Sequence, residues 1–105
     1  MLNLQISRKK DRLFVTVSGE IDHHNSAVIR ESIDIELKCG GIKQLIFDFS
    51  SLEFMDSSGI GVIMGRYRLI SSMGGTVSVI GAAPYIEKIL RLSGLEKIVQ
   101  IVKGA

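Results

Sequence analysis

The chain has 105 residues, a formal net charge of +2 and 46% hydrophobic residues, which fits one ordinary globular domain. Aromatic residues make up only 6% and tryptophan is absent, so the composition favours neither a base-stacking platform nor a sugar-binding surface. Cys39 is the single cysteine, which excludes an internal disulfide. The first residues are too polar for a signal peptide, and no apolar run approaches the about 18 residues of a membrane span. We therefore expect a cytoplasmic protein.

Two segments near the N-terminus alternate between apolar and polar residues. Their apolar positions are Leu2, Leu4, Ile6, Leu13, Val15 and Val17. The charged run at residues 8–12 separates them and is typical of a polar turn. A basic patch for nucleic acid or lipid is the less favoured interpretation of that run. The pattern predicts a β-hairpin with one buried face.

The next segment, residues 24–38, has the pattern of an amphipathic helix. Ile29, Ile33 and Leu37 recur at every fourth position, and the pair Gly40-Gly41 ends the pattern. Asp22 is the candidate N-cap. The following segment, residues 45–49, is almost continuously hydrophobic, which predicts a central strand covered on both faces.

After an expected loop at residues 50–57, the sequence predicts a second helix over residues 58–73. The apolar side chains expected on one side of it are Ile60, Ile63, Met64, Tyr67 and Ile70. A strand at 76–80, a helix at 84–92 and a short strand at 98–102 follow, with Pro84 at the first position of that helix.

The predicted fold is therefore an α/β domain over residues 1–105, a single-domain mixed β-sheet with flanking helices in the order β-β-α-β-α-β-α-(β). Strand–helix–strand units require right-handed crossovers and parallel pairing, whereas the hairpin adds antiparallel strands. No repeat, low-complexity tract or linker interrupts the sequence.

The segment 54–61, FMDSSGIG, contains the strongest candidate for a functional site. Asp56, Ser57 and Ser58 are all residues that cap helices well, so a capped helix with no further role is one interpretation. Two adjacent hydroxyls are, however, redundant for one cap. The start of a helix also suits a phosphate ester, and partners usually meet an α/β domain at the carboxyl end of a central strand. We expect Asp56 or Ser57 to be the cap and the Ser58 hydroxyl to be free.

Three glycines follow in the same helix, although each costs roughly 1 kcal/mol relative to alanine. Gly61 and Gly65 lie one turn apart, and we expect them to allow close approach of the helix to the sheet. Gly59 is expected to keep the start of the helix free of side chains.

The sequence lacks residues that common enzyme motifs require at particular positions. A dinucleotide fingerprint would need a small residue at Met64, and a nucleophile elbow would need glycine at Asp56. No Gly-Lys-Ser/Thr triplet is present, and Asp48 has no acidic cluster near the first strand to help it bind magnesium. His23 and His24 are expected to be surface or capping residues.

The segments 19–24 (GEIDHH), 54–61 and 93–95 (SGL) resemble the anti-sigma-factor antagonists of the STAS domain family, the domains shared with sulfate transporters. The resemblance covers essentially the whole chain and is strongest to the sporulation antagonists. It implies an unphosphorylated protein that binds an anti-sigma factor with serine kinase activity and so releases a sigma factor. The kinase then phosphorylates the antagonist, and a serine phosphatase resets it.

Carried over by position, the resemblance implies phosphorylation at Ser58 and a partner-binding residue at Asp22. The partner surface is predicted to comprise Asp22, Asp56, Ser57, Ser58, Gly59 and Gly61. No cofactor, catalytic residue or metal site is predicted, since His23, His24 and Cys39 lack a shared ligand geometry. Neither nucleic acid nor membrane is an expected direct partner.

Three alternatives stay open. General-stress antagonists share the Asp-Ser-Ser-Gly motif, so the sequence does not identify the sigma factor. A nucleotide-binding protein or enzyme that uses the Ser58 loop is one alternative from another class. A constitutive scaffold of the same fold that is never phosphorylated is the other. Members of the family commonly continue into a further C-terminal helix, whereas this sequence ends at residues 103–105.

Overall fold

A computed structural model describes residues 2–103 of the chain. A mixed sheet has the strand order β1-β2-β3-β5-β6, and β4 pairs separately with β2. The strands are β1 (Asn3–Lys9), β2 (Arg12–Ile21), β3 (Gln44–Asp48), β4 (Leu52–Met55), β5 (Thr76–Ile80) and β6 (Gln100–Val102). Only the β1–β2 pair is antiparallel. The predicted hairpin and mixed sheet are confirmed.

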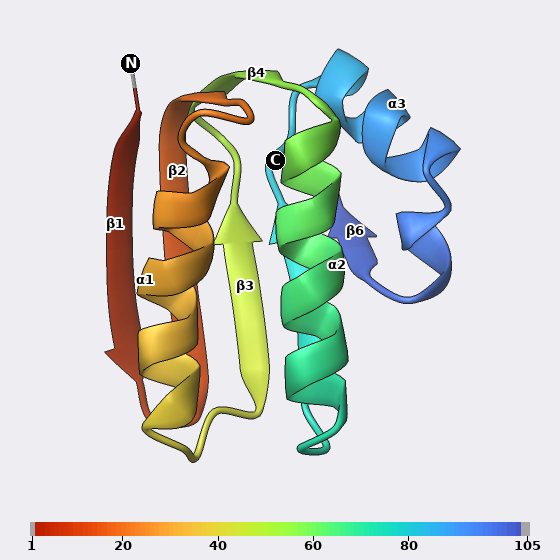
Figure 1. The fold of residues 1–105 in the computed structure, drawn as a ribbon. Coiled ribbons are helices and arrows are strands. Elements are labelled where there is room, and N and C mark those ends of the chain that lie inside the picture. Colours follow the sequence, from red (N-terminus) through yellow and green to blue (C-terminus); the bar gives the residue numbers. More distant parts are fainter. Residues whose placement is uncertain (1, 104–105) are drawn as a thin grey trace.

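The helices are α1 (Ser26–Lys38), α2 (Ser57–Ser71) and α3 (Pro84–Leu92), and a short 3-10 helix, η1 (Leu95–Lys97), precedes β6. Figure 1 shows α1 and α2 next to each other across one face of the sheet, with α3 beyond α2. Both α1 and α2 begin at the same end of the sheet, where β2 and β4 end. No helix within residues 2–103 is both long and apolar enough to cross a membrane.

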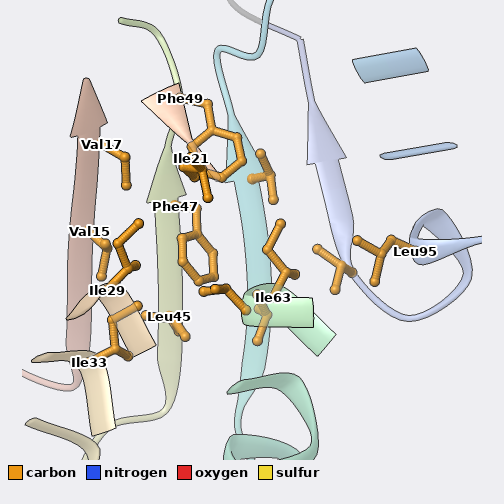
Figure 2. Close-up of a cluster of buried hydrophobic side chains, with 14 of the residues drawn as sticks. Val15, Val17, Ile21, Ile29, Ile33, Leu45, Phe47, Phe49, Ile63 and Leu95 are labelled. Carbon is orange, nitrogen blue, oxygen red and sulfur yellow. The ribbon is translucent and has the colours of Figure 1, made fainter. Parts of the chain in front are cut away.

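The core lies between the sheet and this pair of helices (Figure 2). The alternating pattern of β2 buries Leu13, Val15 and Val17 completely. On the facing helices, Ile29, Ile33 and Ile63 are also completely buried. These buried apolar side chains hold the helices against the sheet. The polar residues at the helix ends are therefore not needed for this packing and can lie near solvent.

The strand β3 is central, because it lies between β2 and β5, as predicted. Its burial nevertheless alternates: Leu45 and Phe47 are buried, whereas Ile46 and Asp48 are only partly covered. The expectation of two fully covered faces was therefore wrong for this strand.

The largest departure from the predicted elements is β4, which occupies half of the expected loop at 50–57. It pairs in parallel with the end of β2, joining Glu20 to Phe54 and Ile21 to Met55. A register shift between Gly19 and Glu20 precedes this pairing, and Gly19 has a positive φ of 89° that glycine adopts readily. A strand of four residues without alternation gives almost no periodic signal.

The buried side of α2 matches the predicted one only in part, since Ile63 and Ile70 are buried as predicted. Its buried residues are Gly59, Val62, Ile63, Arg66 and Ile70, while the expected Ile60, Met64 and Tyr67 are only partly buried against the core. The Arg66 side chain is 9% exposed and its Nε lies 2.8 Å from Asp34 Oδ1 of α1, as an ion pair without an aligned hydrogen bond. Burial lowers the pKa of Arg66, and the charge of Asp34 opposes that effect. An ion pair therefore joins the two helices.

Candidate functional site

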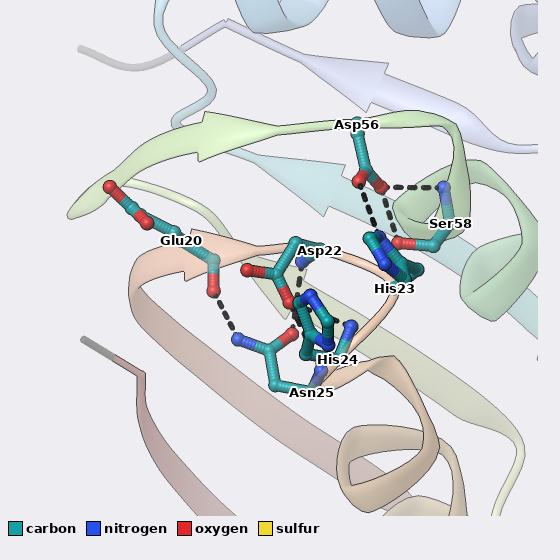
Figure 3. Close-up of polar contacts among 7 residues, drawn as sticks. All are labelled: Glu20, Asp22, His23, His24, Asn25, Asp56 and Ser58. Atoms are coloured by element: carbon teal, nitrogen blue, oxygen red, sulfur yellow. Dashed lines mark hydrogen bonds and ion pairs between the residues drawn. The ribbon is translucent and has the colours of Figure 1, made fainter.

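Strand pairing brings two loops together at one end of the sheet. The backbone N–H of Asp56, just after β4, donates to the carbonyl oxygen of Ile21, the last residue of β2, over 3.1 Å. The loop at residues 22–25 leads from Ile21 into α1, and Asp56 leads directly into α2. The starts of both helices are thus fixed side by side, as Figure 3 shows.

The first turn of α2 is capped by Asp56, which has extended backbone geometry. Its Oδ1 atom accepts a hydrogen bond from the backbone N–H of Ser58 at 2.8 Å and another from the Ser58 hydroxyl. These bonds stabilise the carboxylate, so they lower the pKa of Asp56 below its ordinary value of 3.8, with a smaller contribution from His23. The prediction that either Asp56 or Ser57 caps the helix is confirmed, and the cap is Asp56.

The two serines of the motif differ in environment. Ser57 is exposed, whereas Ser58 is half-buried with its hydroxyl held by Asp56. The prediction of a free Ser58 hydroxyl was therefore wrong. The Ser58 hydroxyl donates to Asp56, and the cap of α2 is Asp56. The placement of Asp56 after β4 decides which of the three cap-type residues is used.

The loop before α1 is held by Asp22 and Asn25. Asp22 Oδ1 accepts from the backbone N–H groups of His24 at 2.9 Å and Asn25 at 3.1 Å. Asn25 in turn accepts from the Asp22 N–H at 3.0 Å and donates to the Glu20 carbonyl at 2.8 Å. The N-cap of α1 is Asn25, so the prediction of Asp22 as the cap was wrong: Asp22 closes the turn that precedes the helix.

His23 connects this loop with the start of α2, a contact that the sequence did not predict. Its Nδ1 lies 4.0 Å from Asp56 Oδ2, and its side chain is 75% exposed. The ring of His24 lies beside it, with ring centroids 4.0 Å apart. Across residues 2–103, no three His, Cys, Asp or Glu side chains are grouped so that they could hold a metal ion.

The glycines of α2 have different roles from those predicted. A Cβ atom on Gly59 would lie 2.3 Å from the Met55 side chain, so Gly59 is the position of close approach. Gly61 and Gly65 have open space in the Cβ direction, and Gly61 is exposed. The expected close packing at Gly61 and Gly65 was wrong. Gly61 instead leaves a flat surface one turn after Ser57 and Ser58.

The structure thus brings Asp22, Asp56, Ser57 and Ser58 to one end of the sheet, with Gly61 on the next turn of α2. The arrangement contains one hydroxyl held by a carboxylate and a surface largely open to solvent. Such a surface can receive a protein partner and present a serine for modification.

The sequence matches the STAS domain over residues 3–104. The chain belongs to the STAS domain family. A relative from Paenibacillus polymyxa, the anti-sigma F factor antagonist, is 41% identical over 102 residues, which cover 95% of this chain and 87% of the relative. The resemblance to anti-sigma-factor antagonists of this family is confirmed.

Solved structures agree with this assignment. The anti-sigma factor antagonist SpoIIAA in its unphosphorylated form has a TM-score of 0.85 and 29% identity, covering 94% of this chain and 87% of that chain. The phosphorylated form of Bacillus SpoIIAA has a TM-score of 0.77 at the same 29% identity, covering 94% and 90% of the two chains. The STAS fold of this chain is thus similar to that of a protein solved in both phosphorylation states.

Proposed function

We propose that this STAS protein is an anti-anti-sigma factor. In its unphosphorylated form it binds an anti-sigma factor that is also a serine kinase, and this binding releases a sigma factor. Phosphorylation of Ser58 ends the interaction, and a serine phosphatase restores it. Support comes from the relative named as an anti-sigma F factor antagonist and from the similarity to SpoIIAA.

The observation that carries this proposal is the position of the serine pair. Ser57 and Ser58 form the first turn of α2, immediately beside the Asp22 loop, at an end of the molecule where helices and strands leave polar groups near solvent. A partner that covers both loops would contact Ser58 directly. We place the partner surface on Asp22, Asp56, Ser57, Ser58 and Gly61. The predicted contribution of Gly59 is dropped, because this residue is buried against Met55.

A charge at Ser58 is sufficient to break such an interface. A phosphoserine adds about −1.5 to −2 charges at pH 7. Burying that charge without a cationic partner costs several kcal/mol. A loss of only about 2.7 kcal/mol weakens binding a hundredfold. Release therefore requires no large conformational change in this domain.

The chain is proposed to be a substrate of the kinase and the phosphatase, without catalytic activity of its own. Nucleotide is used by the kinase, and this chain needs no cofactor for the cycle. The cycle takes place in the cytoplasm, without direct contact with nucleic acid or membrane.

The decisive experiment incubates the protein with its anti-sigma factor kinase and ATP, followed by tandem mass spectrometry. We expect phosphate on Ser58. Ser58→Ala should accept no phosphate and keep binding the kinase, whereas Ser58→Asp should bind poorly. Ser58→Asp is an incomplete mimic, because a carboxylate has less charge and fewer oxygens than a phosphate.

Ser57→Ala is the matched control, because it removes the neighbouring hydroxyl and leaves a modifiable Ser58. Phosphate on Ser57 with Ser58 unmodified would contradict the assignment of the site. Nucleotide turnover by the isolated protein would instead favour an enzyme that uses the same loop.

A further inference from the structure

His23 lies next to the hydroxyl that the proposed cycle modifies. The two oxygens of Asp56 are divided between two neighbours: Oδ1 accepts both bonds from Ser58, and Oδ2 faces Nδ1 of His23 at 4.0 Å (Figure 3). One carboxylate therefore joins the imidazole ring to the serine. No other side chain is needed to connect the loop before α1 with the first turn of α2.

Phosphorylation changes this arrangement at its centre. The kinase transfers the γ-phosphoryl group of ATP to Ser58 Oγ: the new O–P bond replaces the O–H bond, ADP leaves, and the proton passes to solvent. Asp56 then loses its hydroxyl donor and faces a group with about −1.5 to −2 charges. Two anions in contact repel each other, and the imidazole of His23, which lies beside Asp56, is a group that can carry a positive charge.

The inference that follows rests on the proposed modification of Ser58. We infer that His23 is the phosphate-binding residue of this site, and that its ring leaves Asp56 and pairs with the phosphate on Ser58. The side chain of His23 is 75% exposed, so the ring is free to make this small movement.

The acidic groups around His23 do not compete with the phosphate for its ring. Asp22 is engaged with the backbone N–H groups of His24 and Asn25, and Glu20 points away from the ring in Figure 3. His24 lies on the far side of the His23 ring from Asp56 in that view. It therefore provides a matched control with the same chemistry at the neighbouring position.

The proposed pairing of His23 with the phosphate has a consequence for the partner surface. His23 stands between Asp22 and His24 in the chain, and these two residues are joined by the bond from the His24 N–H to Asp22 Oδ1. A ring that moves to the phosphate pulls on this turn. The modification of Ser58 thus also reaches the Asp22 loop, which is the other half of the proposed surface.

The test uses protein in which phosphoserine is placed at position 58 during translation, so that no kinase is required. Phosphorus NMR then follows the second ionisation of the phosphate, which has an ordinary pKa of about 6, in the parent, His23→Gln and His24→Gln proteins. A nearby cation favours the dianion, so we expect the phosphate pKa to be lower by about half a unit to one unit in the parent and His24→Gln than in His23→Gln. Equal titration of the parent and His23→Gln, or an equal change in His24→Gln, overturns the inference.

A second readout follows the backbone amides of residues 22–25. We expect phosphoserine 58 to shift these amide signals in the parent, and the shifts to fall by at least half in His23→Gln. Unchanged shifts in that variant would show that the loop responds without His23. Failure of the kinase to modify Ser58 would refute the proposed function in a separate experiment, and the NMR comparison would still decide whether His23 binds a phosphate there.

Discussion

A carboxylate contacts α2 at its first turn and another contacts it at its middle, but the two carboxylates have different environments. At the first turn, Asp56 is 33% exposed and bonds to Ser58, two residues along the chain. In the middle, the Arg66 side chain is 9% exposed and pairs with Asp34 on α1. The first arrangement is local and close to water, whereas the second joins distant parts of the chain in the interior.

Within α2, the middle of the helix thus contributes to stability, and the first turn carries the candidate functional site. A charge near water can be added or removed at small cost, whereas a buried charge that loses its partner is expensive. The buried pair and the apolar core therefore hold α1 and α2 in register. The proposed phosphorylation of Ser58 would therefore change the first turn and leave the fold intact.

Asp34→Ala should have the largest effect, because it leaves Arg66 buried without its partner. Breaking a fully buried pair costs about 3–5 kcal/mol, and partial exposure of Asp34 reduces this to about 2–3 kcal/mol. Urea denaturation at pH 7 measures the change. Glu31→Ala removes the same charge from an exposed position one turn earlier on α1 and should change stability by less than about 0.5 kcal/mol. Equal stabilities of the two variants would show that the pair does not hold the helices together.

Asp56→Ala should have an intermediate effect, because it removes the cap of α2. Loss of an N-cap side chain costs about 1 kcal/mol. Asp56→Ser retains a capping oxygen and should recover most of the stability in urea denaturation. A serine variant as unstable as the alanine variant would indicate that the carboxylate acts through its charge alone.

The contribution of Asp56 should also depend on pH. Its folded pKa lies below the ordinary value of 3.8, chiefly because the Ser58 hydroxyl and backbone N–H bond to the carboxylate. The stabilisation is therefore complete above about pH 4 and is lost as the pH falls through the lower folded pKa. Urea denaturation of the parent and Asp56→Asn between pH 7 and pH 2.5 measures this loss. Below pH 4 the parent should lose stability relative to Asp56→Asn. A constant difference over that range would contradict this origin.

The elements with a strong local period were predicted well from the sequence. The hairpin, β5 and α3 follow directly from alternation, from bounding glycines and from Pro84. The strand β4 was missed because its four residues carry no alternation and its pairing with β2 is made across distant segments. Burial of Arg66 was missed for a similar reason: its partner lies on another helix, and local periodicity does not encode that contact.

The candidate site was likewise predicted only in part from the sequence. The residue types at 56–58 identified a helix start, but three consecutive cap-type residues left the choice of cap open. Pairing of Met55 with Ile21 fixes the backbone before α2 and makes Asp56 the cap. The contact between His23 and Asp56 likewise depends on where two strands end. The cap position of α1, Asn25, makes no side-chain hydrogen bond to the helix, and the amphipathic pattern alone did not identify it.

Gly61→Trp should have the smallest effect on stability and a large effect on binding. Gly61 is exposed and has no atom within 4 Å of its Cβ position, so a side chain at this position starts in open space. Replacing a helical glycine even gains a few tenths of a kcal/mol in helix propensity. Stability should therefore stay within about 0.5 kcal/mol of the parent. A partner seated on the first two turns of α2 would clash with the ring, and we expect at least a hundredfold loss of affinity for the anti-sigma factor, about 2.7 kcal/mol.

The control for Gly61→Trp is Ser71→Trp, which places the same side chain at the exposed last residue of α2. Calorimetric titration with the anti-sigma factor should give parental affinity for this variant, because it lies at the opposite end of the helix from Ser58. Asp22→Ala should behave like Gly61→Trp in binding, since it alters the other loop at the same end. If Gly61→Trp and Asp22→Ala bind normally while Ser71→Trp does not, the partner covers the far end of α2. Exclusion of the partner by a phosphate on Ser58 would then have no structural basis, because the modified serine would lie outside the interface.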